Sequence, residues 1–490
     1  MVNVKGLGGV LGDFGGWTSS HGIPQVASAK NTCIRTFWTI VVIGTLTVFG
    51  VQFYFMIQQY YTYPVAISTS LRFEELAFPM VTICNINPYK YSKLKVHAPK
   101  MFKLQMKTKF ERQALANRAM VILANELSER KMKEITYSFE ELVKKCHFRG
   151  KECPKSAFKK IMHPSYGACY QFNWETDTNR TVVRSGVAEG LQMQLMVVQE
   201  DPPGYFLPTI ETAAATLAIS PQGYDHFMNS FGLPIAVGYM SLIAMRMSRS
   251  YRMEPPYGQA VQTLESSRYF YKTPYTMEGC FRSCSQAKIM QNCGNCADPR
   301  YAKPDNTTWC TIKQLHCILR LQMKTNSIRS NRTDDDDKCD CPPPLYDEFY
   351  NPTVTQSIYP AENYNVPGSC TRAKDLLDQG FYGEDAREKC LKYYRKNSLL
   401  VKMFYERLNV NNLYENPSYR FAELSADFGG QLGLWVGTSV ISMIEFVGLL
   451  LIVLMFCFAR GRGAVPRGFD GEKAIYDDAD TKAEEEEVNR

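Results

Sequence analysis

The chain has 490 residues, enough for several domains, and its 45% hydrophobic and 21% charged residues are typical of an ordered protein. The net charge of +7 is spread along the chain without a basic stripe interleaved with aromatic residues, so we do not expect nucleic acid as a partner. The sequence has no G-x-S-x-G turn, no glycine-rich phosphate loop with a lysine and no H-E-x-x-H motif. We therefore expect neither an enzyme nor a bound cofactor or metal ion.

An apolar segment near the N-terminus, residues 37–57, is long enough to cross a membrane as a helix. Its 21 residues would reach about 31 Å, the thickness of one hydrocarbon layer. The residues before it are polar and rich in glycine, unlike a secretory signal peptide. Tyrosines form an aromatic belt on its downstream side: Tyr54, Tyr60, Tyr61 and Tyr63. We predict a first transmembrane helix over residues 36–57.

The middle of the chain alternates between strand-like and helix-like segments. Apolar runs rich in β-branched residues, or alternating apolar and polar residues, predict strands over residues 72–87, 191–198, 235–247 and 399–408. Composition and helical periodicity predict helices within residues 110–145 and 371–397, the second broken at Gly380 and Gly383. The cysteine-dense block at residues 280–341 is expected to hold short helices and loops.

Two of the 16 cysteines, Cys33 and Cys457, lie in or beside the apolar segments. The other fourteen form one block from Cys84 to Cys390. An even number in one block is typical of a disulfide framework in an oxidising compartment. The competing interpretation is zinc, because the cysteine pairs at 293/296 and 339/341 have ligand-like spacing. Glycosylation sequons in the same block favour an extracellular location and hence disulfides: Asn179, Asn306 and Asn331.

A second apolar segment, within residues 425–462, is long enough to span a membrane but would be a poor lipid-facing helix. Gly430, Gly433, Gly437 and Glu445 fall near one stripe at helical spacing. A carboxylate at the centre of a lone span costs about 2.5–3.5 kcal/mol on insertion scales, so Glu445 should face water or protein. Ordinary helix packing through glycines is one interpretation. We favour a pore-lining helix, because small residues let the backbone approach an ion.

Positive charges predict that both termini are cytoplasmic, since Lys30 and Arg35 precede the first span and Arg460 and Arg462 follow the second. We therefore predict five segments: a cytoplasmic N-terminus (1–35), a first transmembrane helix (36–57), an extracellular disulfide-rich domain (58–425), a pre-pore turn with a pore-lining second transmembrane helix (426–459) and a cytoplasmic acidic tail (460–490).

Four features occur in a fixed order: His21-Gly22 before the first span, FPMVTICN at residues 78–85, the cysteine-rich block, and DFGGQLGLWVGTS at residues 427–439. In these features the chain resembles the epithelial sodium channel/degenerin family, which includes acid-sensing and peptide-gated channels. The resemblance implies a membrane α+β fold with two transmembrane helices and a disulfide-rich extracellular domain of finger, thumb, palm, knuckle and β-ball. It also implies a homotrimer or heterotrimer, so that two further subunits are partners.

The function implied by the resemblance is a sodium-selective, amiloride-sensitive channel of the plasma membrane, with sodium as the permeant ion. The stimulus that opens the channel is undecided and could be a peptide, another ligand, protons or mechanical force. No histidine directly follows the first span, so the sequence gives no support for proton sensing there. Two alternatives are a two-span trimeric ligand-gated cation channel of another family and a pore-less membrane receptor or adhesion protein. FPMVTICN and the Gly-x-Ser segment count against the first, and the glycine stripe with Glu445 counts against the second.

The resemblance implies that Gly437-Thr438-Ser439 is the selectivity filter and that Gly433 is the amiloride position. It also implies that Asp427 belongs to an outer acidic ring and that Glu445 is an inner acidic residue of the pore. The resemblance implies that the second span breaks at the filter segment and that its backbone faces the ion there. Irregular backbone at membrane depth is tolerated only where it lines a watery path, which is consistent with a filter at this place. Three copies of Asp427 would attract cations to the outer mouth.

Gating roles are implied for the His21-Gly22 pair, as a re-entrant cytoplasmic loop, and for Ala426, where bulky residues hold such channels open. We further expect Tyr257 to stack on Tyr61 or Tyr63 and so to couple the extracellular domain to the pore. The alternative is that these tyrosines are only interfacial aromatics.

By similarity we expect six disulfides: Cys84–Cys169, Cys146–Cys153, Cys280–Cys341, Cys284–Cys339, Cys293–Cys317 and Cys296–Cys310. Acid-sensing relatives have one more pair, at the positions of Ala260 and Leu345 here, so both partners are missing together. Cys370 and Cys390 are left over, and we expect them to pair with each other.

Overall fold

The computed structural model describes residues 7–107, 113–175, 180–199, 207, 209–327, 339–364, 366, 370, 376, 380–383 and 385–461. The chain divides into two compact units, which we describe separately. The terminal unit combines Met1–Ala66 with Pro417–Arg490, and the central unit is Ile67–Asn416.

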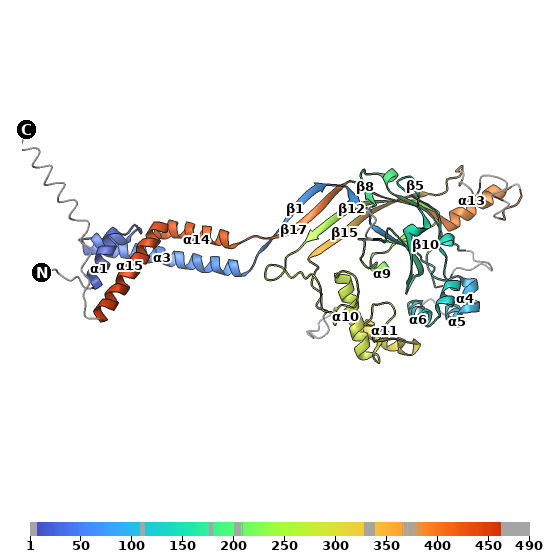
Figure 1. The fold of residues 1–490 in the computed structure, drawn as a ribbon, viewed down its shortest axis with the longest axis horizontal. Coiled ribbons are helices and arrows are strands. Elements are labelled where there is room, and N and C mark those ends of the chain that lie inside the picture. The colour runs from blue at the N-terminus through green and yellow to red at the C-terminus, as the bar shows by residue number, and fades with distance from the viewer. Residues whose placement is uncertain are drawn as a thin grey trace, which may run out of the picture. The chain divides into compact units, whose positions relative to one another are not determined.

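The terminal unit is helical (Figure 1). Its helices are α1 (Leu7–Trp17), α2 (Ile23–Ser28), α3 (Thr32–Tyr61), α14 (Phe421–Val436) and α15 (Val440–Gly461). Helix α3 is long and apolar enough to cross a membrane, and it extends four residues beyond the predicted span at each end. Helices α14 and α15 meet this criterion only as a pair, bent by 78°. By length and composition, the described residues thus contain one continuous candidate span and one bent pair with the form of a broken span or a re-entrant loop.

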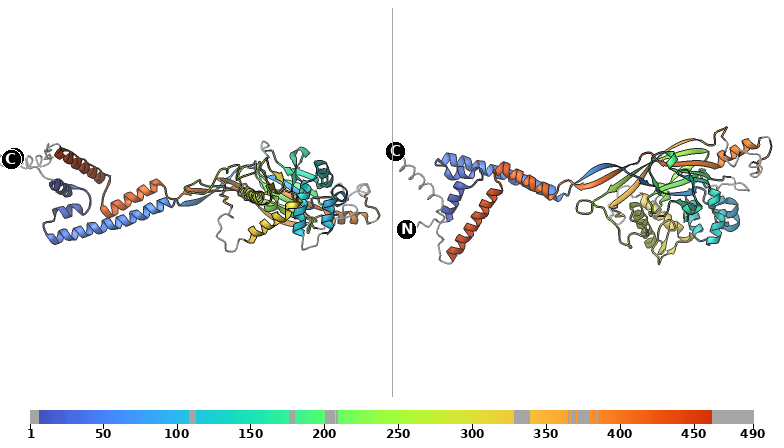
Figure 2. Two further views of the ribbon diagram at one scale, coloured as in Figure 1. Left: turned by 90° about the horizontal axis from the view of Figure 1, so that it is seen from below. Right: turned by 45° about the horizontal axis from the view of Figure 1, so that its top comes forward.

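Helices α3 and α14 lie side by side (Figure 2). The ring of Phe428 lies 6.0 Å from that of Phe49 and 5.4 Å from that of Phe53, between ring centroids. The indole N–H of Trp435 donates to Oε1 of Gln52 at 2.6 Å. One face of α14 therefore packs against α3 through aromatic contacts and a hydrogen bond.

The break between α14 and α15 has a local cause. Gly437 ends α14 in the left-handed region, with φ 64° and ψ 24°, a conformation that glycine adopts without steric cost. The amide of Ser439 then donates to Oγ of Ser442 at 3.1 Å, and the amide of Ser442 donates to Oγ of Ser439 at 3.4 Å. This reciprocal pair satisfies free donors at the start of α15. The stripe that helical periodicity predicts through Gly437 to Glu445 is therefore interrupted, because the helix axis changes direction between them, and the break lies at the segment where the resemblance implied one.

The central unit is built on two sheets (Figure 1). Eight strands form the larger sheet: β1 (Val65–Phe73), β4 (Val143–Phe148), β5 (Lys151–Glu152), β9 (Leu191–Met196), β12 (Tyr239–Tyr251), β15 (Tyr346–Ile358), β16 (Ser398–Tyr405) and β17 (Asn409–Pro417). The order is β1-β17-β12-β16-β9-β4-β5, and β15 also pairs with β12. Strand β12 is the centre of the sheet, since it runs antiparallel to β15 along its whole length and parallel to β16 and β17.

The second sheet has the order β11-β10-β3-β7-β6. Its strands are β3 (Met80–Asn85), β6 (Phe158–His163), β7 (Gly167–Phe172), β10 (Ala214–Ser220) and β11 (Leu233–Ala236). Two small sheets pair β2 (Leu76–Ala77) with β8 (Thr181–Val182) and β13 (Cys296–Ala297) with β14 (Thr308–Trp309). The main core includes Phe78, whose ring contacts those of Phe148, Phe172 and Tyr405 and so joins residues of both large sheets.

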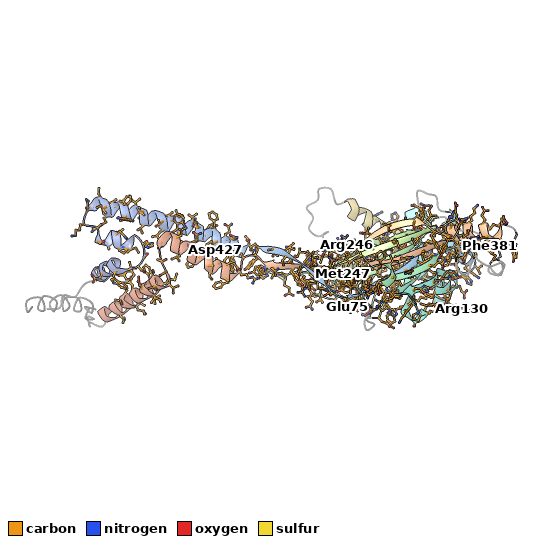
Figure 3. The ribbon with its side chains drawn as sticks, turned by 90° about the horizontal axis from the view of Figure 1, so that it is seen from above. Glu75, Arg130, Arg246, Met247, Phe381 and Asp427 are labelled. Atoms are coloured by element: carbon orange, nitrogen blue, oxygen red, sulfur yellow. A yellow bond between two sulfur atoms is a disulfide. The ribbon has the colours of Figure 1, made fainter. Side chains whose placement is uncertain are left out.

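The described central unit also contains helices and short 3-10 turns. The helices are α4 (Tyr91–His97), α5 (Pro99–Lys107), α6 (Gln113–Asn125), α7 (Glu129–Ile135), α8 (Phe139–Leu142), α9 (Met228–Phe231), α10 (Met277–Asn292), α11 (Leu315–Ser327) and α13 (Ala386–Asn397). The short 3-10 turns are η2 (Lys155–Ala157), η3 (Val187–Glu189) and η4 (Ile312–Gln314). Figure 3 adds the side chains to this arrangement.

Three predicted elements need correction. The strand over residues 72–87 is interrupted between β1, β2 and β3, and the last residues of the predicted 110–145 helical region form β4. The strand over 235–247 is two strands, because Gly238 turns the chain at φ 78° and its amide donates to the carbonyl of Ser398 at 2.7 Å. In the predicted 371–397 helical region the break at Gly380 and Gly383 is confirmed, because both glycines have positive φ and α13, the longest described helical piece, begins after them.

Seven disulfides join described residues, in the pairs that the resemblance implied plus Cys370–Cys390. Four of them are nested: Cys280–Cys341, Cys284–Cys339, Cys293–Cys317 and Cys296–Cys310. At the place of the missing pair, Ala260 is buried, and the amide of Leu345 donates to the carbonyl of Val261 at 3.0 Å. The two segments that such a pair would join are therefore neighbours.

Candidate functional site

The loop that precedes α2 lies against the break between α14 and α15. The amide of His21 donates to the carbonyl of Val436 at 3.1 Å, and Oγ of Ser20 donates to the same carbonyl at 3.4 Å. Val436 is the last residue of α14, so its carbonyl has no partner further along that helix. The N-terminal loop therefore caps the C-terminal end of α14.

His21 and Gly22 contact two different helices of the terminal unit. A Cβ atom placed on Gly437 would lie 1.7 Å from Nδ1 of His21, so the imidazole occupies the space beside this glycine. Gly22 has φ 84°, and a Cβ atom there would lie 2.5 Å from Cγ2 of Val42 on α3. Both glycines are required by conformation and by space.

Glu445, in the second turn of α15, is held by the same loop. Its Oε2 accepts from Oγ1 of Thr18 at 3.1 Å, from the amide of Ser19 at 2.9 Å and from Oγ of Ser19 at 3.1 Å. Oγ of Ser19 also lies 2.5 Å from Oγ of Ser442. Three donors on one carboxylate oxygen satisfy a charge that would be costly in lipid. The loop thus binds both sides of the break, Val436 before it and Glu445 after it.

The face of α14 that points away from α3 is made of small residues. Ala426, Gly430 and Gly433 are spaced four and three apart and share that face, opposite Phe428 and Trp435. All three are exposed in the single chain, and no described atom lies within 4 Å of a Cβ built on Gly430 or Gly433. A face of this kind permits close approach of another helix or of an ion.

Asp427 lies on α14 and is labelled in Figure 3. It is exposed, and its Oδ2 accepts a hydrogen bond from the hydroxyl of Tyr419 at 2.7 Å. This contact ties the carboxylate to the segment that leads into the helix while leaving it accessible to solvent.

The structure brings together one part of the predicted site: His21, Gly22, Gly437, Thr438, Ser439 and Glu445. Ala426, Asp427 and Gly433 are separate from this cluster and lie along α14. Tyr61 and Tyr63 contact each other with ring centroids 6.4 Å apart, but Tyr257 belongs to the central unit, so its stacking on them stays a prediction. Of the glycosylation sequons, Asn306 is described, and Asn179 and Asn331 lie outside the described residues.

Sequence reasoning missed the hydroxyl groups of the site. Thr18 and Ser19 stand three and two residues before His21, and Ser442 stands three residues after Ser439 and three before Glu445. A run of hydroxyl residues beside a motif with a proposed pore role was the available signal, since hydroxyls can donate to an otherwise unpaired carboxylate.

Comparison with known proteins identifies the family. The sequence model described as "Amiloride-sensitive sodium channel" matches residues 14–449. This chain belongs to the amiloride-sensitive sodium channel family. The resemblance to epithelial sodium channels and degenerins is therefore confirmed. Members of this family are ion channels of the plasma membrane that assemble from several related subunits, and they include the degenerins.

Individual relatives are nematode proteins. Degenerin-like protein asic-2 of Caenorhabditis elegans is 32% identical over 92% of this chain and 88% of its own length. Degenerin unc-8 of Caenorhabditis elegans is 28% identical over 72% of this chain, and degenerin mec-10 of Caenorhabditis briggsae is 32% identical over 68%. The chain spans less than half of these last two, 44% of each. A solved proton-activated chloride channel aligns at 6% identity with a TM-score of 0.30, too low to support a structural argument.

Proposed function

We propose that this chain is one subunit of a trimeric, sodium-selective and amiloride-sensitive cation channel, with both termini in the cytoplasm and an extracellular stimulus for opening. The observation that carries the proposal is the break at residues 437–439, with the N-terminal loop bound on both sides of it. A lipid anchor needs no such break, because a continuous helix satisfies its own backbone. The proposal includes no cofactor, and the permeant ion is sodium.

In this proposal the small-residue face of α14 lines the outer part of the pore. Ala426, Gly430 and Gly433 are exposed on one side of a helix whose other side is packed against α3. Three such faces around an axis would leave room for an ion and for amiloride at Gly433. Asp427, exposed on the same helix, would form a ring of three carboxylates that raises the local cation concentration.

The segment Gly437-Thr438-Ser439 would form the selectivity filter. Gly437 takes the backbone out of the helix, so that carbonyl groups in this segment can turn toward the axis instead of continuing the helical ladder. His21 would hold this geometry from the cytoplasmic side, since its ring fills the space beside Gly437. We therefore assign the loop with His21 and Gly22 to gating as well as to support of the filter.

The direct test is to express the chain alone in oocytes and to measure current while peptides, acid, protease and mechanical load are applied in turn. A sodium current blocked by amiloride is expected for at least one stimulus. If the chain alone is silent, it is expressed together with a degenerin of the mec-10 type, because family members assemble with related subunits. Surface-expressed protein that gives no amiloride-sensitive current in either setting would support the pore-less receptor alternative.

The filter assignment has its own test. Ser439→Cys should raise the permeability of potassium relative to sodium, because the side chain at this position sets the distance between backbone and ion. The reversal potential in mixed sodium and potassium solutions reports this ratio. The matched variant Ser425→Cys changes an exposed serine at the start of α14 and should leave the ratio unchanged. An unchanged reversal potential in conducting Ser439→Cys channels would contradict the assignment.

A further inference from the structure

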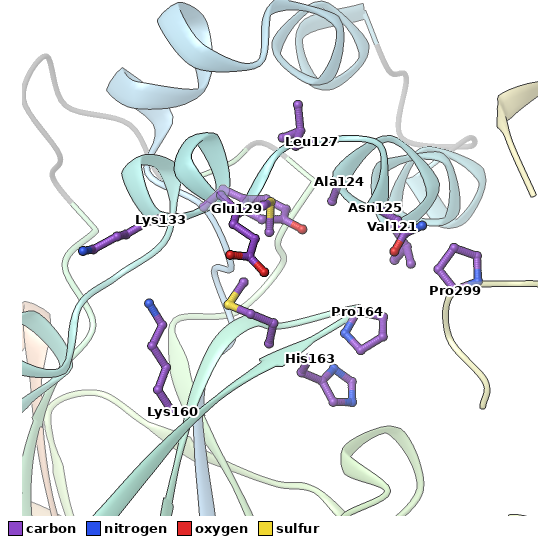
Figure 4. A pocket seen from close by; sticks show the side chains of 13 residues that line it. Val121, Ala124, Asn125, Leu127, Glu129, Lys133, Lys160, His163, Pro164 and Pro299 are labelled. Carbon is purple, nitrogen blue, oxygen red and sulfur yellow. The ribbon is translucent and has the colours of Figure 1, made fainter. Parts of the chain in front are cut away.

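A cavity of about 460 Å³ lies within the central unit, between α6 and α7 on one side and β6 on the other, with Pro299 at one end (Figure 4). This volume is within the range of small-molecule sites. Much of its lining is apolar: Val121, Ala124, Leu127, Met132 and Met162. None of its residues belongs to the candidate pore site, which lies in the terminal unit.

Two lysines line the cavity from opposite walls, Lys133 on α7 and Lys160 on β6. Figure 4 shows both on the side of the cavity away from Pro299. Within the described part of the chain neither ammonium group forms an ion pair, whereas the nearby Lys90 is paired with Glu141 at 2.6 Å. Among the lining residues Glu129 is the one carboxylate. The lining therefore carries an excess of positive charge.

The other titratable residues of the lining are neutral at physiological pH. Burial raises the pKa of Tyr89 above its usual value. Burial, with smaller effects of His226 and Arg282, lowers the pKa of His163 to about 3. Nδ1 of His163 accepts a hydrogen bond from the amide of Ser165 at 3.1 Å, which assigns the ring proton to Nε2. Neither residue cancels the charge of the two lysines.

The charges of neighbouring lysines act on Lys160. Its pKa is lowered, first by burial and then by the charges of Lys133 and Lys90. Both Lys133 and Lys160 are exposed, so solvent weakens this repulsion, and an anion bound between them would neutralise their excess positive charge.

The walls of the cavity are held in place before any ligand arrives. Arg118 on α6 pairs with the buried carboxylate of Asp298 at 3.5 Å, and Arg300 pairs with the same carboxylate at 2.8 Å. These contacts fix α6 against the loop that carries Pro299. On the same wall, the amide of Lys90 donates to the carbonyl of Ile135 at the end of α7, at 2.8 Å. A preformed site loses less free energy to ordering when it binds.

We propose that this cavity binds a small organic anion, with a carboxylate held between Lys133 and Lys160 and an apolar body packed against Met132 and Met162. Charge-assisted hydrogen bonds from the ammonium groups orient the carboxylate. The apolar walls select ligands that carry a hydrocarbon or aromatic part over simple inorganic anions.

The test uses the full chain in lipid nanodiscs and three probes that share one apolar body: 3-phenylpropionate, 3-phenylpropan-1-ol and 3-phenylpropylamine. Ligand-observed saturation-transfer NMR reports binding directly, so the result does not depend on channel activity and stands apart from the proposed function. The carboxylate should bind about tenfold or more tightly than the alcohol, and the amine should bind weakest.

Variants of the two lysines complete the test. Lys133→Gln with Lys160→Gln should remove the preference for the carboxylate, and Lys133→Arg with Lys160→Arg should retain it. The control Lys131→Gln with Lys151→Gln removes the same charge from exposed positions outside the cavity. Equal binding of carboxylate and alcohol, stronger binding of the amine, or equal carboxylate affinity of the Lys133/Lys160 glutamine variant and the control would each overturn the proposal.

Discussion

The imidazole of His21 occupies the position that a side chain on Gly437 would need, with Nδ1 only 1.7 Å from where a Cβ would stand. These residues are more than 400 positions apart in the sequence, yet each determines what the other can be. The contact joins the N-terminal loop to the break between α14 and α15.

Gly437→Ala should disrupt this contact. An L-residue in the left-handed region costs about 1–2 kcal/mol, and the added methyl group also displaces the imidazole. We expect the variant to reach the cell surface but to pass little sodium current, and His21→Ala in the same chain should partly restore it. Gly44→Ala on α3, where no described atom lies within 4 Å of the new methyl group, is the control. Normal current from Gly437→Ala, measured by voltage clamp, would show that the contact is dispensable.

The bonds between the N-terminal loop and Glu445 should act as one unit. Glu445→Gln and Ser19→Ala each weaken charge-assisted hydrogen bonds that contribute about 1.5–3 kcal/mol. We expect both variants to shift the resting open probability in the same direction, and the double variant to add little to either. Single-channel recording of the three variants gives the coupling free energy as a double-mutant cycle. Additive effects would mean that the two residues act independently.

Ala426→Trp should produce a standing sodium current that amiloride blocks. Ala426 is exposed on the side of α14 opposite α3, where three subunits are proposed to converge. Overpacking a tight contact typically costs about 1–3 kcal/mol, and each of three subunits would contribute that cost to the closed state. A differential near 5.5 kcal/mol converts a population of about 1:99 to 99:1. Variant channels that stay closed at rest and open normally would show that this face is not crowded when closed.

Ala260→Cys with Leu345→Cys should form an additional disulfide. The amide of Val261 donates to the carbonyl of Pro343, and that of Leu345 donates to the carbonyl of Val261, both at 3.0 Å. Because Cys280–Cys341 already closes most of the chain between the two positions, the effective new loop is short. We expect a gain in unfolding free energy of about 3 kcal/mol or less. Mass spectrometry after alkylation detects the bond, and each single variant should instead show one alkylated thiol more than the parent chain, which already has a free thiol at Cys33.

The central unit should lose stability on acidification through His163. Its pKa in the folded chain is about 3, below the value of 6.5 for a free histidine, so folding favours the neutral ring. The stabilisation is complete above pH 6.5 and decreases as the pH falls from 6.5 toward 3. The unfolding temperature should therefore drop between pH 7.5 and pH 5, and by less in His163→Gln. His316→Gln, at an exposed position on α11, should retain the full drop. An equal drop in the two variants would assign the effect to other groups.

Sequence reasoning was successful where a pattern has a local cause. The apolar helix α3 followed from a continuous apolar run, and the disulfide framework followed from cysteines that match a family. It failed where geometry depends on distant residues. The glycines at 430, 433 and 437 read as one helical stripe, because periodicity does not register the single left-handed residue that ends α14. The sequence did not predict the hydrogen bond between Thr18 and Glu445, because a hydroxyl and a carboxylate each have many potential partners.

The nested disulfides around α10 and α11 have a consequence for a chain that is cut. Cys280 and Cys284 lie before residues 318–338 in the sequence, and their partners Cys341 and Cys339 lie after. Cleavage of one peptide bond within residues 318–338 would therefore leave two fragments joined by two covalent bonds. Such a molecule would migrate as an intact chain on a non-reducing gel and separate only after reduction. Helix α3 and the helices α14 and α15, which belong to different fragments, would stay tethered through the disulfides of the central unit.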